Sequence, residues 1–430
     1  MKVVSSILVT LLLVCLGAVP EADSAVPKLR FSPAEGLMNE PVSIDISGLR
    51  PSSRITVVAR MTIVGNWRSH ATFVVDQNGR VRLDRDAPVD GTYTGIDGMG
   101  LFWATLPEQP DGAPPPPPPD VRAPVLATFD VEAEGQTIAS AIYKRWWVRP
   151  DVRISDVQAD GLIGKFFEPQ TTGRPHPGIL VLGGSEGGTN DLAAAGFAAK
   201  GYAPLALAYF RRRPAREAGS DSLPNELVNI PLEYFLKATD WLQHQKSVDP
   251  RRLAIFGGSR GAEAALLVAS IDPRYRVVIA YAPTSVSGAG IGKQNADKPS
   301  WTYRGEPIPF APNNLTVAAL RAGIDPAHGS IPIERSHAAI FLASAGDDWI
   351  SRARAATVMG DLLIDRLKQS KYPYPYQHLS YAHAGHIFGM FFLPGPILAS
   401  GGGTPQANAA AVADATPRML AFLKENLSRR

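Results

Sequence analysis

The first part of the chain, from residue 28 to about residue 107, alternates apolar and polar positions in short runs. Examples are EPVSIDISGL, RITVVARM and HATFVVDQNGRVRL, which Pro, Gly, Asn-Gly and Asp-Gly turns separate. A period of two over runs of this length is typical of strands that bury one face. The pattern therefore predicts antiparallel strands in a β-sandwich.

A proline-rich stretch, QPDGAPPPPPPD, follows these strands and contains six consecutive prolines at residues 114–119. Prolines donate no backbone hydrogen bond and favour an extended polyproline conformation. We therefore expect a surface loop or spacer here. Because the alternation resumes in VLATFDVEAEGQTIASAIYKRWWV, the sandwich domain is predicted to span residues 25–150.

Beyond residue 150 the pattern changes to nearly continuous apolar runs, namely GILVLGG, YAPLALAYF, RLAIFGG, RVVIAYAP and AAIFLASAG. Helix-length segments lie between most of them, for example residues 227–245 and 351–368. Apolar strands that alternate with helices predict a mostly parallel sheet covered on both faces. Residues 151–430 are thus expected to form an α/β domain. Residues 284–337 break this rhythm and have the length of a lid or substrate wall.

One strand-to-helix junction carries candidate chemistry. The apolar run RRLAIFG enters a G-x-S-x-G pattern at Gly257, Ser259 and Gly261, and the helix-like GAEAALLVAS leaves it. A serine hydroxyl needs a base that takes its proton and donors that stabilise the oxyanion. A strained corner holds such a serine, and the two glycines avoid collisions there. An ordinary turn serine is the alternative, but this context favours a nucleophile. The backbone N–H of Arg260 would then face the oxyanion.

The partners of such a serine follow it in the order acid, then histidine. The segment AAIFLASAGDDWIS places Asp347 directly after a buried-strand pattern, and we predict it as the acid, with Asp348 as its rival. The segment HLSYAHAGHIFG offers His378, His383 and His386. Because His386 lies in a glycine-flanked loop beyond the next strand, we predict it as the base, with His383 as the alternative.

A second glycine-rich loop follows GILVLGG at residues 183–188. The loop after an earlier strand supplies the second oxyanion donor in this arrangement, here the amide of Ser185 or of Glu186. Such loops also bind phosphate, but neither dinucleotide nor P-loop spacing accompanies this one. Since no H-E-x-x-H motif or comparable carboxylate cluster is evident, we expect no metal and no cofactor. The basic run FRRRPAR, residues 210–216, is interpreted as a solvated loop.

The composition agrees with a globular protein of one large and one smaller domain. The chain has 430 residues, of which 45% are hydrophobic and 19% are charged. Its net charge of +3 is small for this length. Nucleic-acid binding would require basic residues concentrated on one face, so we expect no nucleic-acid partner.

The amino terminus, MKVVSSILVTLLLVCLGAVPEADSA, has the pattern of an export signal. Lys2 precedes an apolar stretch, and a small-residue cleavage pattern, Ala22-Asp23-Ser24, lies just before Ala25. We predict residues 1–24 as a signal peptide that is removed, so that the exported protein keeps no stable membrane anchor. A retained membrane span or a lipid on Cys15 are the alternatives. Cys15 is the only cysteine, so the mature protein would have neither a cysteine nucleophile nor a disulfide.

Taken together, these segments resemble the acyl-CoA thioesterase and bile acid-CoA:amino acid N-acyltransferase family over nearly all of the mature chain. The matching segments are SGLRPSSRITVVARM, SHATFVVDQNGRVRLDRDAP, GTYTGIDGMGLFWA, LPNELVNIPLEYF, GGSRGAEAALLVAS, TYRGEPIPF, IPIERSHAAIFLASAGDDW and YAHAGHI. The resemblance implies an immunoglobulin-like sandwich before an α/β-hydrolase domain. It also implies a small-molecule acyl substrate and a triad of Ser259, Asp347 and His386.

Departures from the family pattern bear on the reaction. Members that conjugate amino acids use cysteine, whereas Ser259 matches the hydrolytic members and favours attack by water. Coenzyme A is mainly cytoplasmic, so export favours another ester or thioester. The family's PPY-like motif after the histidine is absent, because this chain reads HIFGMFFLPG. We predict a serine-dependent thioester hydrolase. Acyl transfer to an amine or alcohol, carboxylester hydrolysis and a non-catalytic exported binding protein are the alternatives.

Overall fold

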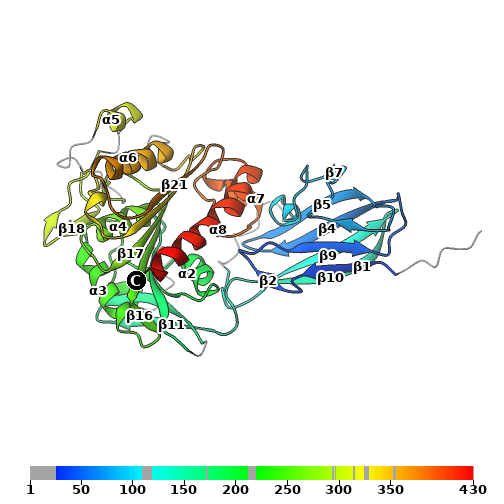
Figure 1. The fold of residues 1–430 in the computed structure, drawn as a ribbon, viewed down its shortest axis with the longest axis horizontal. Helices are drawn as coiled ribbons and strands as arrows, with labels where there is room; N and C mark the ends of the chain where they lie inside the picture. Colours follow the sequence, from blue (N-terminus) through cyan, green and yellow to red (C-terminus); the bar gives the residue numbers. More distant parts are fainter. Residues whose placement is uncertain are drawn as a thin grey trace, which may run out of the picture.

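The computed structural model describes residues 26–108, 119–170, 173–211, 219–292, 295, 297–312, 315–323, 329–351 and 355–429. The described chain forms two domains that lie end to end along the long axis of the molecule (Figure 1). The amino-terminal domain, coloured blue to cyan, consists mainly of strands, and the larger domain alternates strands and helices. The predicted signal peptide, with Cys15, and residues 114–118 of the proline run lie outside the described residues.

The amino-terminal domain contains two mostly antiparallel sheets whose inward side chains share one core. In β5 (Asn66–Val74) every second residue is buried, as the alternating pattern predicts. One sheet has the order β1-β3-β6 and the other β2-β10-β9-β4-β5-β7, with β8 beside β5. The other bounds are β1 (Lys28–Ser32), β2 (Gly36–Leu37), β3 (Ser43–Ser47), β4 (Arg54–Thr62), β6 (Val81–Arg82), β7 (Asp90–Gly91), α1 (Gly100–Trp103), β8 (Leu106–Pro107), β9 (Val125–Ala133) and β10 (Gln136–Trp146).

The larger domain is built on an eight-stranded sheet with the order β11-β12-β14-β13-β16-β17-β20-β21. The strands from β14 to β21 run parallel, and β12 pairs antiparallel with both of its neighbours. Every residue of β14 and β20 is buried. The bounds are β11 (Val152–Ala159), β12 (Leu162–Pro169), β13 (His176–Leu182), β14 (Ala203–Ala208), β16 (Val248–Gly258), β17 (Tyr275–Tyr281), β20 (Ala339–Ala345) and β21 (Tyr376–Tyr381).

Helices cover both faces of this sheet, which explains the continuous apolar runs in its strands. In β16, Ala254 and Phe256 pack in the core that contains α2 (Asp191–Ala198) and α8 (Pro405–Ser428). Ile255, between them, packs in the opposite core, whose helices are α3 (Leu232–Gln243), α4 (Arg260–Ala269) and α6 (Ala356–Gln369). The predicted fold class is confirmed: a β-rich domain precedes an α/β domain with a mostly parallel sheet.

The connections hold the remaining short elements. The segment predicted to break the α/β rhythm, residues 284–337, carries two short strands, a short α-helix and the 3-10 helix η3 (Ile333–Arg335) within its described part. The strands are β18 (Trp301–Tyr303) and β19 (Glu306–Pro307), and the α-helix is α5 (Val317–Arg321). Outside this segment, β15 (Ile230–Pro231) pairs with β18, and α7 (Gly395–Leu398) precedes α8. No helix in the described ranges combines the length and the apolar composition needed to cross a bilayer.

The two domains share a continuous apolar core that contains one buried arginine. Arg145 of the sandwich is 0% exposed and donates to the carbonyls of Met38 (2.7 Å) and Phe392 (3.2 Å). Burial lowers the pKa of Arg145 to about 10. The Trp147 and Phe391 rings meet edge to face with centroids 5.3 Å apart. The sandwich therefore packs against the segment that follows His386.

Candidate active site

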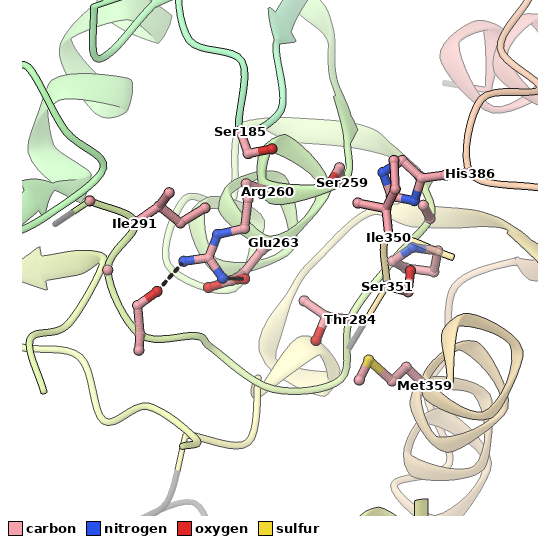
Figure 2. Close-up of a pocket in the computed structure, with 15 residues that line it drawn as sticks. Ser185, Ser259, Arg260, Glu263, Thr284, Ile291, Ile350, Ser351, Met359 and His386 are labelled. Carbon is pink, nitrogen blue, oxygen red and sulfur yellow. Dashed lines mark hydrogen bonds and ion pairs between the residues drawn. The ribbon is translucent and has the colours of Figure 1, made fainter. Parts of the chain in front are cut away.

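The candidate site lies at the carboxyl ends of the parallel strands, where open α/β sheets usually bind their ligands. Loops after β13, β16, β20 and β21 converge there on a cavity of about 390 Å³. Figure 2 shows the side chains that line it. They include Ser185, Ser259, Arg260, Ile291, Ile350 and His386. Thr284 and residues 289–292 also line it, so the segment predicted as a lid or substrate wall supplies one wall.

Ser259 occupies the predicted strained corner between β16 and α4. Its φ of 54° and ψ of −120° lie where residues with a Cβ are rarely found. The corner admits only glycine at the second residue before and the second residue after Ser259. A Cβ on Gly257 would lie 2.0 Å from the carbonyl oxygen of Gly261, and one on Gly261 would lie 2.3 Å from that of Gly183. The hydroxyl-bearing residue is thus held at the start of α4 by close backbone packing.

His386 is paired with a buried carboxylate. Its Nδ1 lies 2.7 Å from Oδ2 of Asp348, which is 0% exposed. Asp348 also accepts the backbone N–H groups of Ile350 (2.9 Å) and Ser351 (2.8 Å), and the Ser351 hydroxyl (2.6 Å). Burial acts to raise the pKa of Asp348, but the contacts with His386 and Ser351 outweigh it and hold this pKa below its usual value. The acid is therefore kept ionised at neutral pH.

The structure corrects the prediction that Asp347 orients His386. Asp347 points outward, and its nearest histidine contact is His383 at 3.6 Å, where both side chains are largely exposed. The Asp347 amide donates to the carbonyl of Ala384 (3.0 Å), which fixes the direction of the chain. The side chain of the next residue, Asp348, therefore points inward. It accepts the backbone N–H groups of Ile350 and Ser351, which forms a tight turn.

The other histidine candidate, His378, lies on β21 away from the cavity. Its Nε2 is 2.6 Å from Oγ of Ser344, and its Nδ1 is 3.1 Å from Oδ1 of Asp361. Burial lowers the pKa of His378, and the nearby Asp361 opposes this shift. His386 is thus the histidine that the fold brings into one cavity with Ser259.

Two backbone amides were predicted as oxyanion donors. Arg260 is the first residue of α4, where backbone N–H groups have no acceptor within the helix. Ser185 lines the cavity on the loop after β13. The side chain of Glu186 turns back and accepts the amide of Gly184 at 2.9 Å.

The sequence reasoning missed Glu263, a carboxylate on α4 that is 1% exposed. Glu263 accepts hydrogen bonds from Arg260 Nη1 (2.6 Å), the Gly288 amide (2.7 Å) and Trp301 Nε1 (2.7 Å). Arg260 also donates to the carbonyl of Ala289 (3.1 Å). Because Arg260 and Glu263 both lie on α4, their hydrogen bonds with Gly288 and Ala289 hold the cavity wall against this helix. The sequence signal that could have identified Glu263 is its position as the single carboxylate in the mostly apolar segment GAEAALLVAS.

Asn408 on α8 is a second residue that was missed. It is 0% exposed, and its Oδ1 accepts the amide of Gly385 at 2.6 Å. Its Nδ2 donates to the carbonyls of Leu398 and Gly402, both at 3.0 Å. Asn408 therefore ties the residue before His386 to the segment that ends at Gly402. Nothing in its local sequence distinguishes it from a surface asparagine.

That segment, residues 398–402, contacts both the loop that carries Asp348 and the loop that carries His386. The carbonyl of Gly401 accepts the amides of both His386 and Trp349, each at 3.1 Å. A Cβ on Gly402 would lie 2.0 Å from the carbonyl oxygen of Asp347. The His386–Asp348 geometry thus depends on three chain segments that cross at close range.

Two further predictions concern regions beside the site. In the described ranges, no group of three or more His, Cys, Asp or Glu side chains is arranged to hold a metal ion. Most of the basic run at residues 210–216 lies outside the described residues. Arg211, which is described, pairs with Asp221 at 2.6 Å.

Comparison with known proteins agrees with the two-domain arrangement. The acyl-CoA thioester hydrolase/BAAT N-terminal region matches residues 39–159, and the BAAT/acyl-CoA thioester hydrolase C-terminal region matches residues 230–429. The chain belongs to this family. The family predicted from the sequence segments is therefore confirmed, and homology to its thioesterases implies a hydrolase.

Individual relatives cover nearly the whole chain. Acyl-coenzyme A thioesterase 5 of Mus musculus is 30% identical over 438 residues, which cover 94% of this chain and 97% of the relative. The mitochondrial acyl-coenzyme A thioesterase 2 of Mus musculus is 28% identical over 414 residues, covering 91% and 87%. Among solved structures, a dienelactone hydrolase-like promiscuous phosphotriesterase from metagenomic libraries shares 16% identity at a TM-score of 0.42, covering 64% of this chain and 98% of that one.

Proposed function

We propose that the protein hydrolyses acyl thioesters through a covalent acyl-enzyme on Ser259. The observation that carries this proposal is the 2.7 Å contact between Asp348 and His386 Nδ1, in the cavity that Ser259 also lines. A carboxylate on Nδ1 orients the ring and leaves Nε2 to act on the serine. The strained conformation of Ser259 supports the same role.

In the acylation step, His386 Nε2 takes the proton of Ser259 Oγ while that oxygen attacks the acyl carbonyl carbon. The backbone N–H groups of Arg260 and Ser185 are the proposed donors to the oxyanion that forms. When the intermediate collapses, the carbon–sulfur bond breaks and His386 protonates the leaving thiolate. Asp348 stabilises the imidazolium that exists between these proton transfers.

In the deacylation step, His386 takes a proton from water, which attacks the ester carbonyl on Ser259. Collapse breaks the bond between the acyl carbon and Oγ, and the serine recovers its proton from His386. The products are a free acid and the regenerated enzyme. A serine nucleophile supports hydrolysis over transfer to an amine, because the amino-acid-conjugating relatives that the chain resembles use cysteine.

The substrate class is inferred from the relatives, which are named as acyl-coenzyme A thioesterases. We propose an acyl thioester of this kind, with simple carboxylic esters as the alternative. A panel of acyl-CoAs, acyl-pantetheines and p-nitrophenyl esters of matched chain length would rank the leaving groups. If esters exceed all thioesters in kcat/KM, the carboxylester alternative replaces the thioesterase proposal.

The decisive experiment compares the parental protein with a Ser259→Ala variant. The parent should release thiol and free acid and should be labelled by a fluorophosphonate, whereas the variant should do neither. Product analysis with glycine, taurine or an alcohol present tests the transfer alternative. A variant that still cleaves thioesters at the parental rate would refute the acyl-enzyme mechanism.

We also propose that residues 1–24 direct export and are removed. The proposal stems from Lys2, the apolar stretch after it and the small residues before Ala25. Expression of the full chain, followed by amino-terminal sequencing of the exported fraction, should give a chain that starts at Ala25. An intact amino terminus in the cell fraction would contradict the proposal.

A further inference from the structure

Exposed large hydrophobic side chains are distributed unevenly between the two domains. In the sandwich they are scattered, with Ile96, Leu126 and Ile142 as examples. Among the described residues from 151 onward, those that are exposed are Ile291 (40%), Trp349 (62%) and Ile350 (53%). Single exposed apolar residues need no explanation, but a group confined to one place marks a binding surface.

Two of these residues, Ile291 and Ile350, lie at the Ser259 cavity, and Trp349 is the sequence neighbour of Ile350; the three are called here the apolar rim. Ile291 and Ile350 both line the cavity, although they come from segments far apart in the sequence. Figure 2 shows them on opposite sides, with Ser259 between them. Trp349 directly precedes Ile350 and is more exposed than either isoleucine. The rim therefore extends the apolar wall of the cavity outward.

The backbone of the apolar rim is anchored to the site. The Trp349 amide donates to the carbonyl of Gly401 (3.1 Å), and the Ile350 amide donates to Asp348 Oδ1 (2.9 Å). The Ile291 amide donates to the carbonyl of Leu227 (3.0 Å). These contacts fix the backbone of the three residues, whose apolar side chains are exposed to water unless a ligand covers them.

We propose that Trp349, Ile350 and Ile291 bind the acyl chain where it leaves the cavity and thereby set the chain-length preference. This inference rests on the proposed hydrolase function. The cavity, at about 390 Å³, is near the lower end of the 300–1,000 Å³ typical of ligand sites. A chain too long for the cavity has to extend beyond its lining, which includes Ile291 and Ile350, and uncharged apolar side chains suit a hydrocarbon better than a polar leaving group.

The proposal makes the effect of the rim depend on chain length. Each methylene that rests on the rim should raise kcat/KM by up to about fourfold, the factor for burying one methylene group. Carbons that remain inside the cavity should be indifferent to Trp349. The ratio of kcat/KM for a long chain over a short one is therefore the quantity to measure.

The experiment compares the parental protein with the variants Trp349→Ser and Ile291→Ser on butanoyl, octanoyl and dodecanoyl thioesters below their micellar concentrations. We expect the dodecanoyl-to-butanoyl ratio to fall about tenfold or more in each variant, mainly through KM. The matched control is Ile96→Ser, which removes a similarly exposed side chain (61%) from the sandwich and should leave the ratio unchanged.

Two outcomes would overturn the rim proposal while the hydrolase proposal stands. An unchanged ratio would show that the rim does not touch the chain. An equal loss at all chain lengths would show that it acts on the leaving group or on the Asp348 loop.

A binding measurement separates failure of the rim from failure of the hydrolase. Intact Ser259→Ala protein, which should not turn over, is titrated with dodecanoyl thioester while tryptophan fluorescence is followed. The emission should shift on binding, and adding Trp349→Phe should abolish the shift. If the parent cleaves no thioester, the proposed function fails. If the shift persists without Trp349, the rim proposal fails instead.

Discussion

Among the described residues of the α/β domain, serine, histidine and aspartate come together in the cavity described above and also at a more interior place, between β20, β21 and α6. At the interior place, Ser344 Oγ, His378 and Asp361 form a complete chain of close contacts. Yet Ser344 lies within β20 at 0% exposure, with ordinary strand geometry. No acyl carbonyl can reach its hydroxyl.

The two places differ in access, backbone strain and the burial of the acid. Ser259 lines a cavity at a strained corner, directly before the first residue of α4. Its acid, Asp348, is fully buried, whereas the side chain of Asp361 is 68% exposed. Close contacts among a serine, a histidine and an aspartate are therefore not sufficient for the serine to act as a nucleophile. What distinguishes the cavity is a serine at an accessible, strained corner, where the proposed oxyanion donors Arg260 and Ser185 also line the space.

The largest expected difference is between the two serines. Ser259→Ala should lower kcat by about 10⁵-fold or more, because no other group supplies the proposed nucleophile. Ser344→Ala should keep the parental kcat per folded molecule. It should lower the free energy of unfolding by about 1–3 kcal/mol, because it leaves His378 Nε2 buried without its partner. Thioester hydrolysis and urea unfolding measure the two effects. A large loss of kcat in Ser344→Ala would contradict the expectation that only Ser259 takes part in the reaction.

Next in size is the contrast between the adjacent aspartates. Asp348→Asn should lower kcat by about 10³- to 10⁴-fold, because an amide does not stabilise the imidazolium or hold its tautomer. Asp347→Asn changes a half-exposed side chain beside His383 and should alter kcat by less than about threefold. Steady-state kinetics on one thioester decides between them. Equal losses would restore Asp347 as a candidate for the acid.

A smaller effect is expected from Asn408, which acts through the position of His386. Asn408→Leu should lower kcat by about 10- to 100-fold with little change in KM, because a small displacement of a reacting group is costly. The control is Asn426→Leu on the same helix, where the amide donates only within α8, to Phe422 (2.8 Å). Unfolding measurements on both variants check whether a difference in stability explains the difference in kcat. If the two lose kcat equally, Asn408 has only a structural role.

The smallest effect concerns pH and His378. Because burial lowers its folded-state pKa below the ordinary value of about 6.5, the unfolded chain binds a proton more readily. Above pH ~6.5 the group should contribute no pH dependence, and below it the free energy of unfolding should fall until the folded pKa is reached. His378→Gln should flatten this part of the stability profile, measured by urea unfolding from pH 7.5 to 5. A parental profile that is flat over this range would contradict the expectation.

Most of the fold and part of the site could be predicted because they depend on local patterns. Alternation with a period of two is sufficient for strands that bury one face, and continuous apolar runs indicate strands buried on both. The corner at Ser259 is also local, since Gly257 and Gly261 are needed within a few residues of it. The loop position of His386 followed from its glycine neighbours. These features depend on the residue itself and its immediate sequence.

The sequence by itself determined the two domain types, the family and the strand-to-helix corner of Ser259. Only the tertiary structure decided which of two adjacent aspartates faces His386, because the backbone contacts of Asp347 with Ala384 and Gly402 set that direction. It also decided the roles of Glu263 and Asn408. The role of a buried polar side chain depends on hydrogen-bond partners that lie far along the chain, and the neighbouring residues in the sequence do not identify those partners.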